Sequence, residues 1–552
     1  MAKSVNKVEP TRPVVSYEDH EGNLRAFSPL TPKTNNTRAA VEVPPAKVMP
    51  VIVIAGIMGS NLRAHVNSAE GRNTHLNSGE AAWRPPNGID AGLNEAKKWR
   101  GRSPAVRQEI LDGNTLEVDP SGPIPRGATT DGVVWDEKIA SERGWGEIHL
   151  ASYGLLLVTL QQNLNRTYRS LYGNPMLEGN WISLNLEDRA KWGTQKEGFG
   201  APLTDEELKK FAQFHYPVYA FGYNWLKSNL DSAQSLQNRI ENIIAYWKNK
   251  KRECNGVLLV THSMGGLVAR ACAQNIPGLI AGIVHGVMPA LGAPACYRRL
   301  ACGTESSSPS NSIIENKGAE KFAEIAGVTV AETTPILSTA AGPLELLPNH
   351  LYPKPWLFAE SNNEKNKPNF FNLTVDDPYN LYLDFKSWYR LVDLSFADPA
   401  NKYKGNVDKV IASAVNQAKK FHMEVVKDYY HPQTFVFYGN DETKRSFGTF
   451  RWKLTTTQSN LAESVLKAAK LKVHLVGGGR RIETCTGVLV EVKPSVQDVS
   501  GDGTVPFQSG VGPQGKVKQI FATKNYSHQE SYSNSDMLSL TRHLIVKLMQ
   551  EV

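Results

Sequence analysis

The chain alternates between short apolar runs and longer segments whose apolar residues recur at helical spacing. The apolar runs are rich in β-branched residues, which is typical of strands buried on both faces. They lie at residues 49–55, 218–221, 257–260, 279–287, 433–439 and 516–521. Segments with one apolar face lie at residues 148–172, 228–250, 406–427 and 533–552. This order predicts an α/β fold in which helices cover both faces of a mostly parallel sheet.

Two long segments depart from this alternation. Residues 62–145 are polar, rich in Gly and Pro and only weakly periodic. Residues 301–430 are first rich in Ser, Gly, Ala and Thr and then in large aromatic residues. Irregular segments of this length inside a compact protein are usually packed excursions with a function. We therefore expect two insertions that form a cap or lid; a surface helical hairpin without a gating role fits the first part of the second insertion equally well.

Residues 1–47 are rich in Pro, Thr, Asn and Lys, which predicts an irregular N-terminal arm. We expect the remaining residues, 48–552, to form one domain with the two insertions. Alternating apolar and polar positions indicate further β-structure near the end of that domain, at residues 448–454, 471–476 and 487–492.

Composition narrows the class of protein without defining it. A hydrophobic content of 41% is ample for a large core. The formal net charge of +8 is dispersed, so it is compatible with anionic lipid head groups but does not indicate nucleic-acid binding. Five cysteines without a CxxC or His/Cys cluster predict no metal site, and no cofactor is implied. The sequence shows neither a secretory signal nor a membrane span, so export requires another machine.

The clearest chemical signal is a serine between a strand and a helix. Ser263 follows the apolar run 257–260 and precedes a segment with helical spacing, which predicts the nucleophile elbow of a hydrolase. Gly265 and Gly266 supply the small neighbours that a sharp turn needs, whereas Thr261 replaces the usual first glycine. A serine that only caps the helix is the alternative.

Two backbone N–H groups are candidates for binding a tetrahedral oxyanion. Met264 follows the serine at the start of the helix, where the helix dipole also favours negative charge. Ile57 lies in the glycine-containing loop after the first central strand, where this kind of fold places its second donor. An ordinary exit from a strand is the alternative for that loop.

The acid and the base are expected after the serine, in the order Ser, Asp, His. Asp502 lies between two glycines, and His528 lies in the loop after the last predicted strand. A turn aspartate and an exposed loop histidine are the alternatives. Asp498 and His543 compete for the two roles, but His543 lies in the terminal apolar helix, where packing is its ordinary use.

Seven motifs in this order resemble the lecithin:cholesterol acyltransferase-like lipase family. The likeness implies an α/β-hydrolase fold with Ser263 as nucleophile, Asp502 as acid, His528 as base, and Ile57 and Met264 as oxyanion donors. Ala55 stands where the family has Pro, and Asn224 where it has Asp. The motifs are residues 55–62, Tyr223-Asn-Trp225, residues 261–266, Leu346-Leu-Pro348, Phe437-Tyr-Gly439, residues 501–506 and His528.

The lid-like insertion and the loop at residues 288–299 are also similar to bacterial lipase effectors delivered by type VI secretion. That likeness implies a protein made in the bacterial cytoplasm without a signal peptide and exported to the periplasm of a target cell. It also implies a phospholipid membrane as substrate and two kinds of protein partner, an immunity protein and a component of the secretion machine.

We therefore predict a serine lipase or phospholipase that cleaves acyl esters of glycerophospholipids through an acyl-enzyme. An acyltransferase that uses the same three residues is one alternative. A hydrolase-fold binding module without catalysis is the other, and Thr261 is the residue that favours it.

Overall fold

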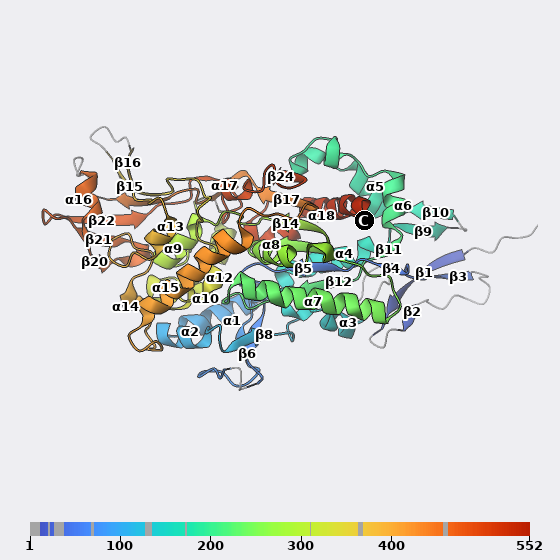
Figure 1. Cartoon of the computed structure of the whole chain (residues 1–552), viewed down its shortest axis with the longest axis horizontal. Helices are drawn as coiled ribbons and strands as arrows, with labels where there is room; N and C mark the ends of the chain where they lie inside the picture. The colour runs from blue at the N-terminus through green and yellow to red at the C-terminus, as the bar shows by residue number, and fades with distance from the viewer. Residues whose placement is uncertain are drawn as a thin grey trace, which may run out of the picture.

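A six-stranded parallel sheet forms the centre of the computed structural model, which describes residues 11–19, 23–26, 38–67, 71–126, 135–171, 174–309, 311–362, 368–455 and 462–552 (Figure 1). All neighbouring strands of the central sheet run parallel. In sheet order they are β12 (Val218–Phe221), β5 (Val51–Ile54), β13 (Val257–His262), β14 (Ile280–Gly286), β17 (Thr434–Gly439) and β24 (Gln519–Thr523). The predicted strand runs therefore form one sheet.

Helices cover both faces of this sheet, as predicted. On β5, Ile52 and Ile54 belong to one apolar core, while Val51 and Val53 belong to a second core on the other face. This alternation is the two-residue period of a strand that is buried on both sides. Helices α7 (Asn229–Asn249) and α8 (Gly265–Asn275) pack into the first core. Helices α4 (Leu150–Leu164) and α18 (Ser535–Leu548) pack into the second.

The first predicted insertion lies outside the central sheet. Within residues 62–145, β7 (Ala81–Trp83), β6 (Leu62–Ala64) and β8 (Leu116–Val118) form a small sheet in that order. The described part of the segment also includes the helices α1 (Ile89–Arg100), α2 (Pro104–Ile110) and α3 (Glu137–Glu142). The small sheet and the first two helices lie along the lower side in Figure 1.

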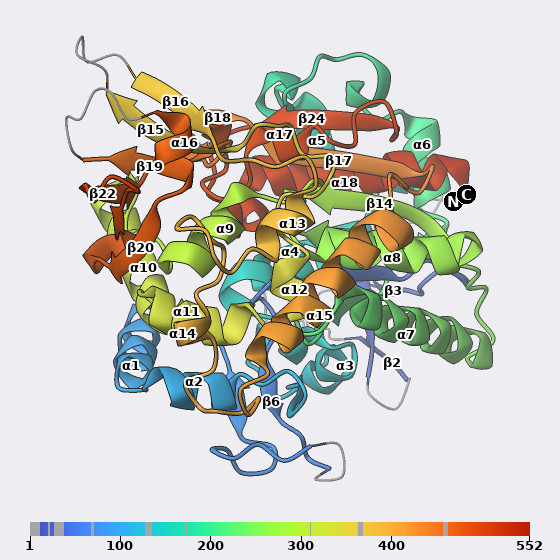
Figure 2. The same cartoon turned by 60° about the vertical axis from the view of Figure 1, so that its left-hand side comes forward.

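The second insertion packs against the first. Its helices α10 (Ile313–Ala326) and α11 (Val330–Leu337) contact α1 and α2, as Figure 2 shows. The buried Arg107 of α2 donates hydrogen bonds to the carbonyl oxygens of Ile325, at 2.9 Å, and Glu324, at 2.8 Å. The guanidinium of Arg107 thus supplies hydrogen-bond donors to carbonyl oxygens at the C-terminal end of α10. This contact joins the two insertions, which are about 200 residues apart in the chain. Their role as a lid stays a prediction.

A second sheet of six strands lies outside the central sheet. Its six strands lie at the left end of Figure 1. In sheet order they are β16 (Pro368–Asn372), β15 (Leu357–Asn362), β19 (Phe450–Leu454), β22 (Leu489–Pro494), β21 (Arg480–Glu483) and β20 (Lys470–His474). The late alternating segments were predicted, whereas β15 and β16 lie in the aromatic part of the second insertion and were not.

The prediction of an irregular N-terminal arm is wrong for part of residues 1–47. Strands β1 (Thr11–Glu18), β2 (Leu24–Ala26) and β3 (Arg38–Glu42) form a sheet of order β2-β1-β3. Strand β3 pairs in parallel with β1, from Thr11 opposite Arg38 to Val15 opposite Glu42. Strand β1 also pairs antiparallel with β2, from Ser16 opposite Ala26 to Glu18 opposite Leu24. Composition alone does not reveal such backbone pairing.

Candidate active site

Ser263 lies in a strained turn between β13 and α8. Its φ angle is 52°, in the left-handed region that residues other than glycine rarely adopt. The backbone N–H of Ser263 donates to the carbonyl oxygen of Gly286 in the neighbouring strand, at 2.9 Å. A Cβ on Gly265 would lie 2.5 Å from the carbonyl oxygen of Ala55. The turn is thus pressed against the end of β5, and only glycine fits there.

Thr261, which replaces the usual first glycine, points away from the turn. Its hydroxyl lies 2.8 Å from Nδ1 of His285, the residue opposite it on β14. Burial lowers the pKa of His285 to about 3, so this histidine is neutral and pairs with a neutral hydroxyl. The threonine therefore occupies space between two central strands and leaves the geometry at Ser263 intact.

The structure brings the three predicted side chains into one hydrogen-bonded series. Nε2 of His528 lies 2.8 Å from Oγ of Ser263. Nδ1 of the same imidazole lies 2.7 Å from Oδ2 of Asp502. His528 begins the short helix η8 (His528–Ser533) after β24, and Asp502 directly follows β23 (Val499–Gly501). Residues 265 positions apart in the chain therefore meet at the carboxyl edge of the central sheet.

The carboxylate of Asp502 is fixed in place by backbone groups. The carboxylate is 1% exposed, and Oδ1 accepts hydrogen bonds from the backbone N–H groups of Thr504, at 3.0 Å, and Val505, at 2.7 Å. Its backbone carbonyl oxygen accepts the N–H of His528 at 2.8 Å. A Cβ on Gly439 would lie 2.6 Å from the Cβ of Asp502, so the end of β17 supports the acid directly.

The two competing candidates have other roles. Oδ1 of Asp498 accepts the backbone N–H of Gly448 at 2.8 Å, and its Oδ2 accepts the hydroxyl of Thr449. His543 is buried in α18, and its Nε2 lies 2.7 Å from the carbonyl oxygen of Phe199. Burial lowers the pKa of His543 to about 3. Both residues stabilise the packing of the chain.

The predicted oxyanion loop lies directly against the serine. A Cβ on Gly56 would lie 2.7 Å from Nδ1 of His262 and 2.9 Å from the Cβ of Ser263. The loop turns between Gly56 and Gly59, whose N–H donates to the Gly56 carbonyl at 3.0 Å. This turn places Ile57 beside Ser263, and Met264 follows the serine in the chain. Their role as oxyanion donors stays a prediction.

Sequence reasoning missed two residues in contact with this site. His262 precedes the serine, and Tyr153 lies on α4 in the core. Nε2 of His262 lies 2.9 Å from the carbonyl oxygen of His528, and its Nδ1 lies 2.9 Å from the Tyr153 hydroxyl. The position of His262 next to the serine is a sequence signal for its contact with the site. The sequence does not indicate a role for Tyr153 at the site, because a tyrosine on an apolar helix is usually a core residue.

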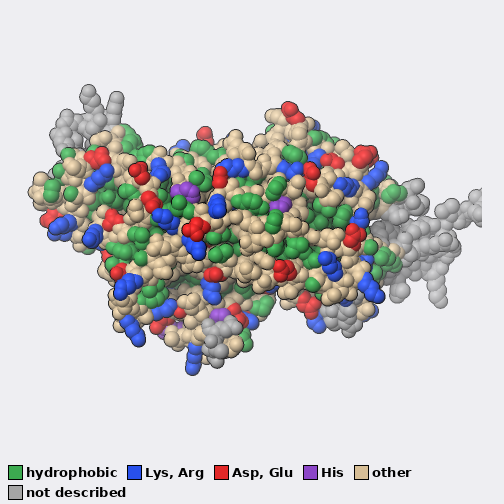
Figure 3. Space-filling view, in the orientation of Figure 1, with side chains coloured by type: hydrophobic (Ala, Val, Ile, Leu, Met, Phe, Trp, Pro, Cys, Tyr) green, Lys and Arg blue, Asp and Glu red, His purple; other side chains and the backbone are tan. Residues whose placement is uncertain are grey.

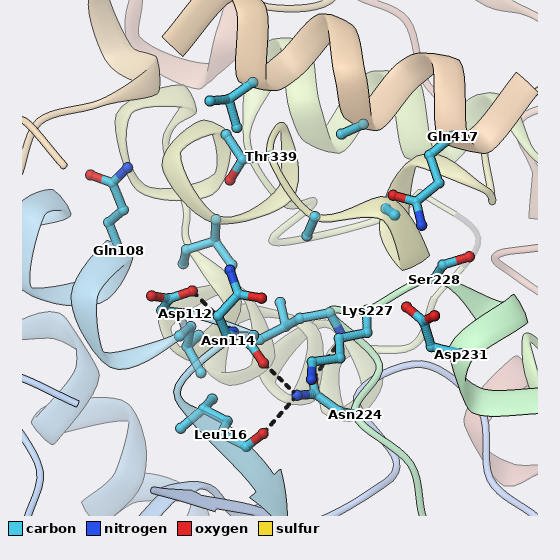
Figure 4. A pocket seen from close by; sticks show the side chains of 18 of the residues that line it. Gln108, Asp112, Asn114, Leu116, Asn224, Lys227, Ser228, Asp231, Thr339 and Gln417 are labelled. Carbon is cyan, nitrogen blue, oxygen red and sulfur yellow. Dashed lines mark hydrogen bonds between the residues drawn. The ribbon is translucent and has the colours of Figure 1, made fainter. Parts of the chain in front are cut away.

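A polar cleft of about 920 Å³ opens on the same edge of the sheet (Figure 4). It lies between the first insertion, the start of α7 and the helices α11, α12 (Ala341–Leu344) and α15 (Val407–Lys420). Its wall includes residues 222–224, which follow β12. Asn224, an aspartate in the resembling family, donates to the carbonyl oxygens of Gly113, at 2.9 Å, and Leu116, at 3.0 Å. It therefore fixes the loop that forms one wall.

The outer surface carries no long block of one charge on the side seen in Figure 3, where Lys and Arg are interspersed with Asp and Glu. Among the residues that the structure describes, no helix has both the length and the apolar character needed to cross a membrane.

Comparison with known proteins agrees with this fold. A family model described as the PGAP1-like alpha/beta domain matches residues 212–308, which include β12, the elbow and α9 (Pro294–Cys302). The chain is also 43% identical over 68 residues to the uncharacterized protein YJR098C of Saccharomyces cerevisiae (strain ATCC 204508 / S288c). That match covers 12% of this chain and 10% of the yeast protein, so the chain spans about a tenth of the curated relative.

Together with the central sheet and the elbow, these matches define an α/β-hydrolase fold with a lipase-like domain, as predicted. The likeness extends over most of the chain in one solved structure, described as the crystal structure of a Tle4–Tli4 complex. The match has a TM-score of 0.72 and 27% sequence identity, and it covers 91% of this chain and 98% of the other. The chain is thus similar to Tle4 in its insertions as well as in its central sheet.

The contact between Gly265 and Ala55 gives a direct test of the elbow. We expect Gly265→Ala to lower the free energy of unfolding by about 1–3 kcal/mol, because a backbone atom must move to admit the methyl group. Gly278→Ala is the matched control, since a Cβ at Gly278 meets nothing within 4 Å. Denaturant titration compares the two variants. Equal stability of both would show that the elbow is not closely packed.

Proposed function

We propose that this protein is a serine lipase or phospholipase that hydrolyses acyl esters of glycerophospholipids. The observation that carries the proposal is the hydrogen-bonded series Ser263, His528, Asp502 at the elbow. A serine hydroxyl is a weak nucleophile unless a base accepts its proton, and the base needs a group that holds its tautomer. The two hydrogen bonds of His528 supply both requirements.

The reaction proceeds in two steps. In the first, Nε2 of His528 takes the proton of Ser263 while Oγ attacks the ester carbonyl carbon. The oxyanion that forms accepts hydrogen bonds from the N–H groups of Ile57 and Met264. The carbon–oxygen bond to the glycerol then breaks, and His528 returns the proton to the leaving oxygen. In the second, His528 activates a water that releases the fatty acid from Ser263, and Asp502 holds the imidazole of His528 in both steps.

The similarity to Tle4 supports a lipid substrate and a cellular location for the reaction. Tle4 is a lipase effector of type VI secretion. We propose that this chain is likewise made in the bacterial cytoplasm, leaves through a type VI machine and acts on phospholipid from the periplasm of a target cell. Because Tle4 was solved with Tli4, we also propose that a cognate immunity protein and a secretion component bind this chain.

Replacement of the nucleophile tests this function. We expect Ser263→Ala to lower hydrolysis of phospholipid vesicles by at least about 10³-fold, because it removes the atom that forms the acyl-enzyme. Mass spectrometry of the products should show fatty acid and lysophospholipid with the unchanged protein alone. Ser338→Ala is the matched control, since the buried Ser338 hydroxyl has no hydrogen-bond partner among the described residues.

Full hydrolysis by Ser263→Ala would contradict the proposal. Transfer of the acyl group to an added alcohol, with little free fatty acid, would instead identify an acyltransferase. Absence of any turnover by the unchanged protein, over a range of lipids, would favour a binding module.

A further inference from the structure

Helix α4 connects the two loops between which the proposed reaction takes place. The backbone N–H of His149, just before α4, donates to the carbonyl oxygen of Gly59 in the oxyanion loop at 2.9 Å. One turn further on, Ser152 accepts a hydrogen bond from the amide of Gln529, the residue after His528. Tyr153 lies beside them with its ring fully buried. One rigid helix thus contacts both loops.

The hydrogen bonds through Tyr153 have only one consistent direction. The tyrosine oxygen accepts the backbone N–H of Gly56 at 2.9 Å, so its own proton is free to point at Nδ1 of His262, also at 2.9 Å. Nδ1 is then an acceptor, and the imidazole proton lies on Nε2. That N–H donates to the carbonyl oxygen of His528 at 2.9 Å. Each of these polar groups is satisfied by its neighbour.

His262 is suited to this role only as a neutral ring. Burial lowers the pKa of His262 to about 3, and the nearby His528 lowers it as well. A positive charge here would lie beside the imidazole of His528, whose ring centre is 5.1 Å away. It would oppose the charge that His528 gains when it takes the proton of Ser263.

We propose that Tyr153 and His262 are positioning residues, which fix the imidazole of His528 relative to the oxyanion loop without touching the substrate. This inference rests on the proposed function. The backbone of His528 is held on both sides, by Asp502 through its N–H and by His262 through its carbonyl oxygen. The same series reaches the N–H of Gly56, next to the proposed donor Ile57. The series therefore sets how far the base lies from the oxyanion donors.

A second hydrogen-bonded series of a tyrosine hydroxyl, a histidine ring and a backbone carbonyl lies elsewhere in the core. It serves as a matched control. The hydroxyl of Tyr379 lies 2.9 Å from Nδ1 of His422, whose Nε2 lies 2.7 Å from the carbonyl oxygen of Glu345. Both rings are buried, and burial lowers the pKa of His422 to about 4. These residues share no hydrogen bond with Ser263, His528 or Asp502 within the described structure, so they report only the structural cost of each substitution.

The test compares Tyr153→Phe and His262→Gln with Tyr379→Phe and His422→Gln. We expect the first pair to lower kcat by about 10- to 100-fold with KM changed less than about threefold, because a small displacement of the base acts on the chemical step. Rates of labelling by a fluorophosphonate should fall in parallel. The second pair should lower the unfolding midpoint by a similar amount and leave kcat within about twofold.

Partial rescue separates positioning from packing. His262→Gln keeps an N–H that reaches the His528 carbonyl, whereas His262→Leu keeps none, so kcat should be higher for Gln. Equal kcat losses in both pairs, or equal activity of Gln and Leu, would overturn the proposal. If the unchanged protein reacts with the fluorophosphonate but hydrolyses no lipid, the proposed function is wrong. The labelling rates of the four variants then still test whether Tyr153 and His262 position the base.

A second, independent inference concerns the cleft of Figure 4. Its wall at residues 222–224 follows β12, which is two strands from β13 in the sheet. Neighbouring strands lie about 4.8 Å apart, so the end of β12 lies roughly 10 Å along the edge from the end of β13, which Ser263 follows. A phospholipid whose ester lies at Ser263 extends its head group over a length of this order, so the cleft is within its reach.

Three charged side chains that line this cleft, Lys227, Asp231 and Lys409, have no ion pair among the described residues. Lys409 lies on α15 and donates to Oδ1 of Asn406, so Lys227 and Asp231 are the two that have no side-chain partner in the described structure. Lys227 is half-buried just before α7, and Asp231 lies in the first turn of that helix. Figure 4 shows both side chains on the same wall of the cleft. A phosphoethanolamine group carries a phosphate and an ammonium two carbons apart. We infer that the cleft receives this zwitterionic head group, with its phosphate near Lys227 and its ammonium near Asp231.

This inference also rests on the proposed function and predicts a preference among lipids. We expect Asp231→Asn to lower the ratio of phosphatidylethanolamine to phosphatidylglycerol hydrolysis by at least about fivefold, because it removes only the contact to the ammonium. Hydrolysis of p-nitrophenyl butyrate, which has no head group, should stay unchanged. Asp90→Asn is the control, since Asp90 lies in the first turn of α1 outside the cleft.

An unchanged lipid ratio in Asp231→Asn and Lys227→Gln would overturn the head-group assignment. Equal loss on the lipids and the short ester would overturn it as well. Hydrolysis of the short ester without hydrolysis of either lipid by the unchanged protein would instead contradict the proposed phospholipid substrate.

Discussion

The close approach of the ends of β5 and β13 is the constraint on which the rest of the site depends. Ser263 adopts a φ of 52°, and Gly265 and Gly56 leave no room for a side chain against the facing backbone and His262. Because the strands are parallel neighbours, their carboxyl ends lie on one edge of the sheet. The proposed nucleophile and oxyanion loop are therefore adjacent before any other part of the site is added.

The other central strands complete the arrangement from the same edge. Strand β14 supplies the carbonyl that holds the N–H of Ser263, β17 supports Asp502 through Gly439, and β24 leads into His528. One set of polar atoms buried at this edge is paired in series, from Gly56 through Tyr153 and His262 to His528 and Asp502. A buried polar network that is fully paired is rigid, and a rigid base and donor set is what acyl transfer requires.

Local patterns predicted the parts of the molecule that local interactions determine. The buried strands were visible because β-branched runs mark strands covered on both faces, and Ser263 was visible because small residues follow it at a turn. Asp502 and His528 required the chain order known for this fold. Tyr153 and the pairing of β15 with β19 depend on contacts between residues about 90 or more positions apart, for which the sequence carries no periodic signal. The strands of the N-terminal arm were missed for a different reason, because a composition rich in Pro, Thr, Asn and Lys indicated an irregular segment although Thr11 pairs with Arg38 there.

The central claim is that Ser263 carries the acyl group during turnover, and trapping that group tests it most directly. The protein is mixed with a phospholipid of defined chains, quenched in acid within milliseconds and digested, and its peptides are weighed by mass spectrometry. The account predicts the mass of one fatty acyl group on the peptide that contains Ser263, which disappears as free fatty acid is released. Release of fatty acid with the acyl group on another residue, or on none, would contradict the account.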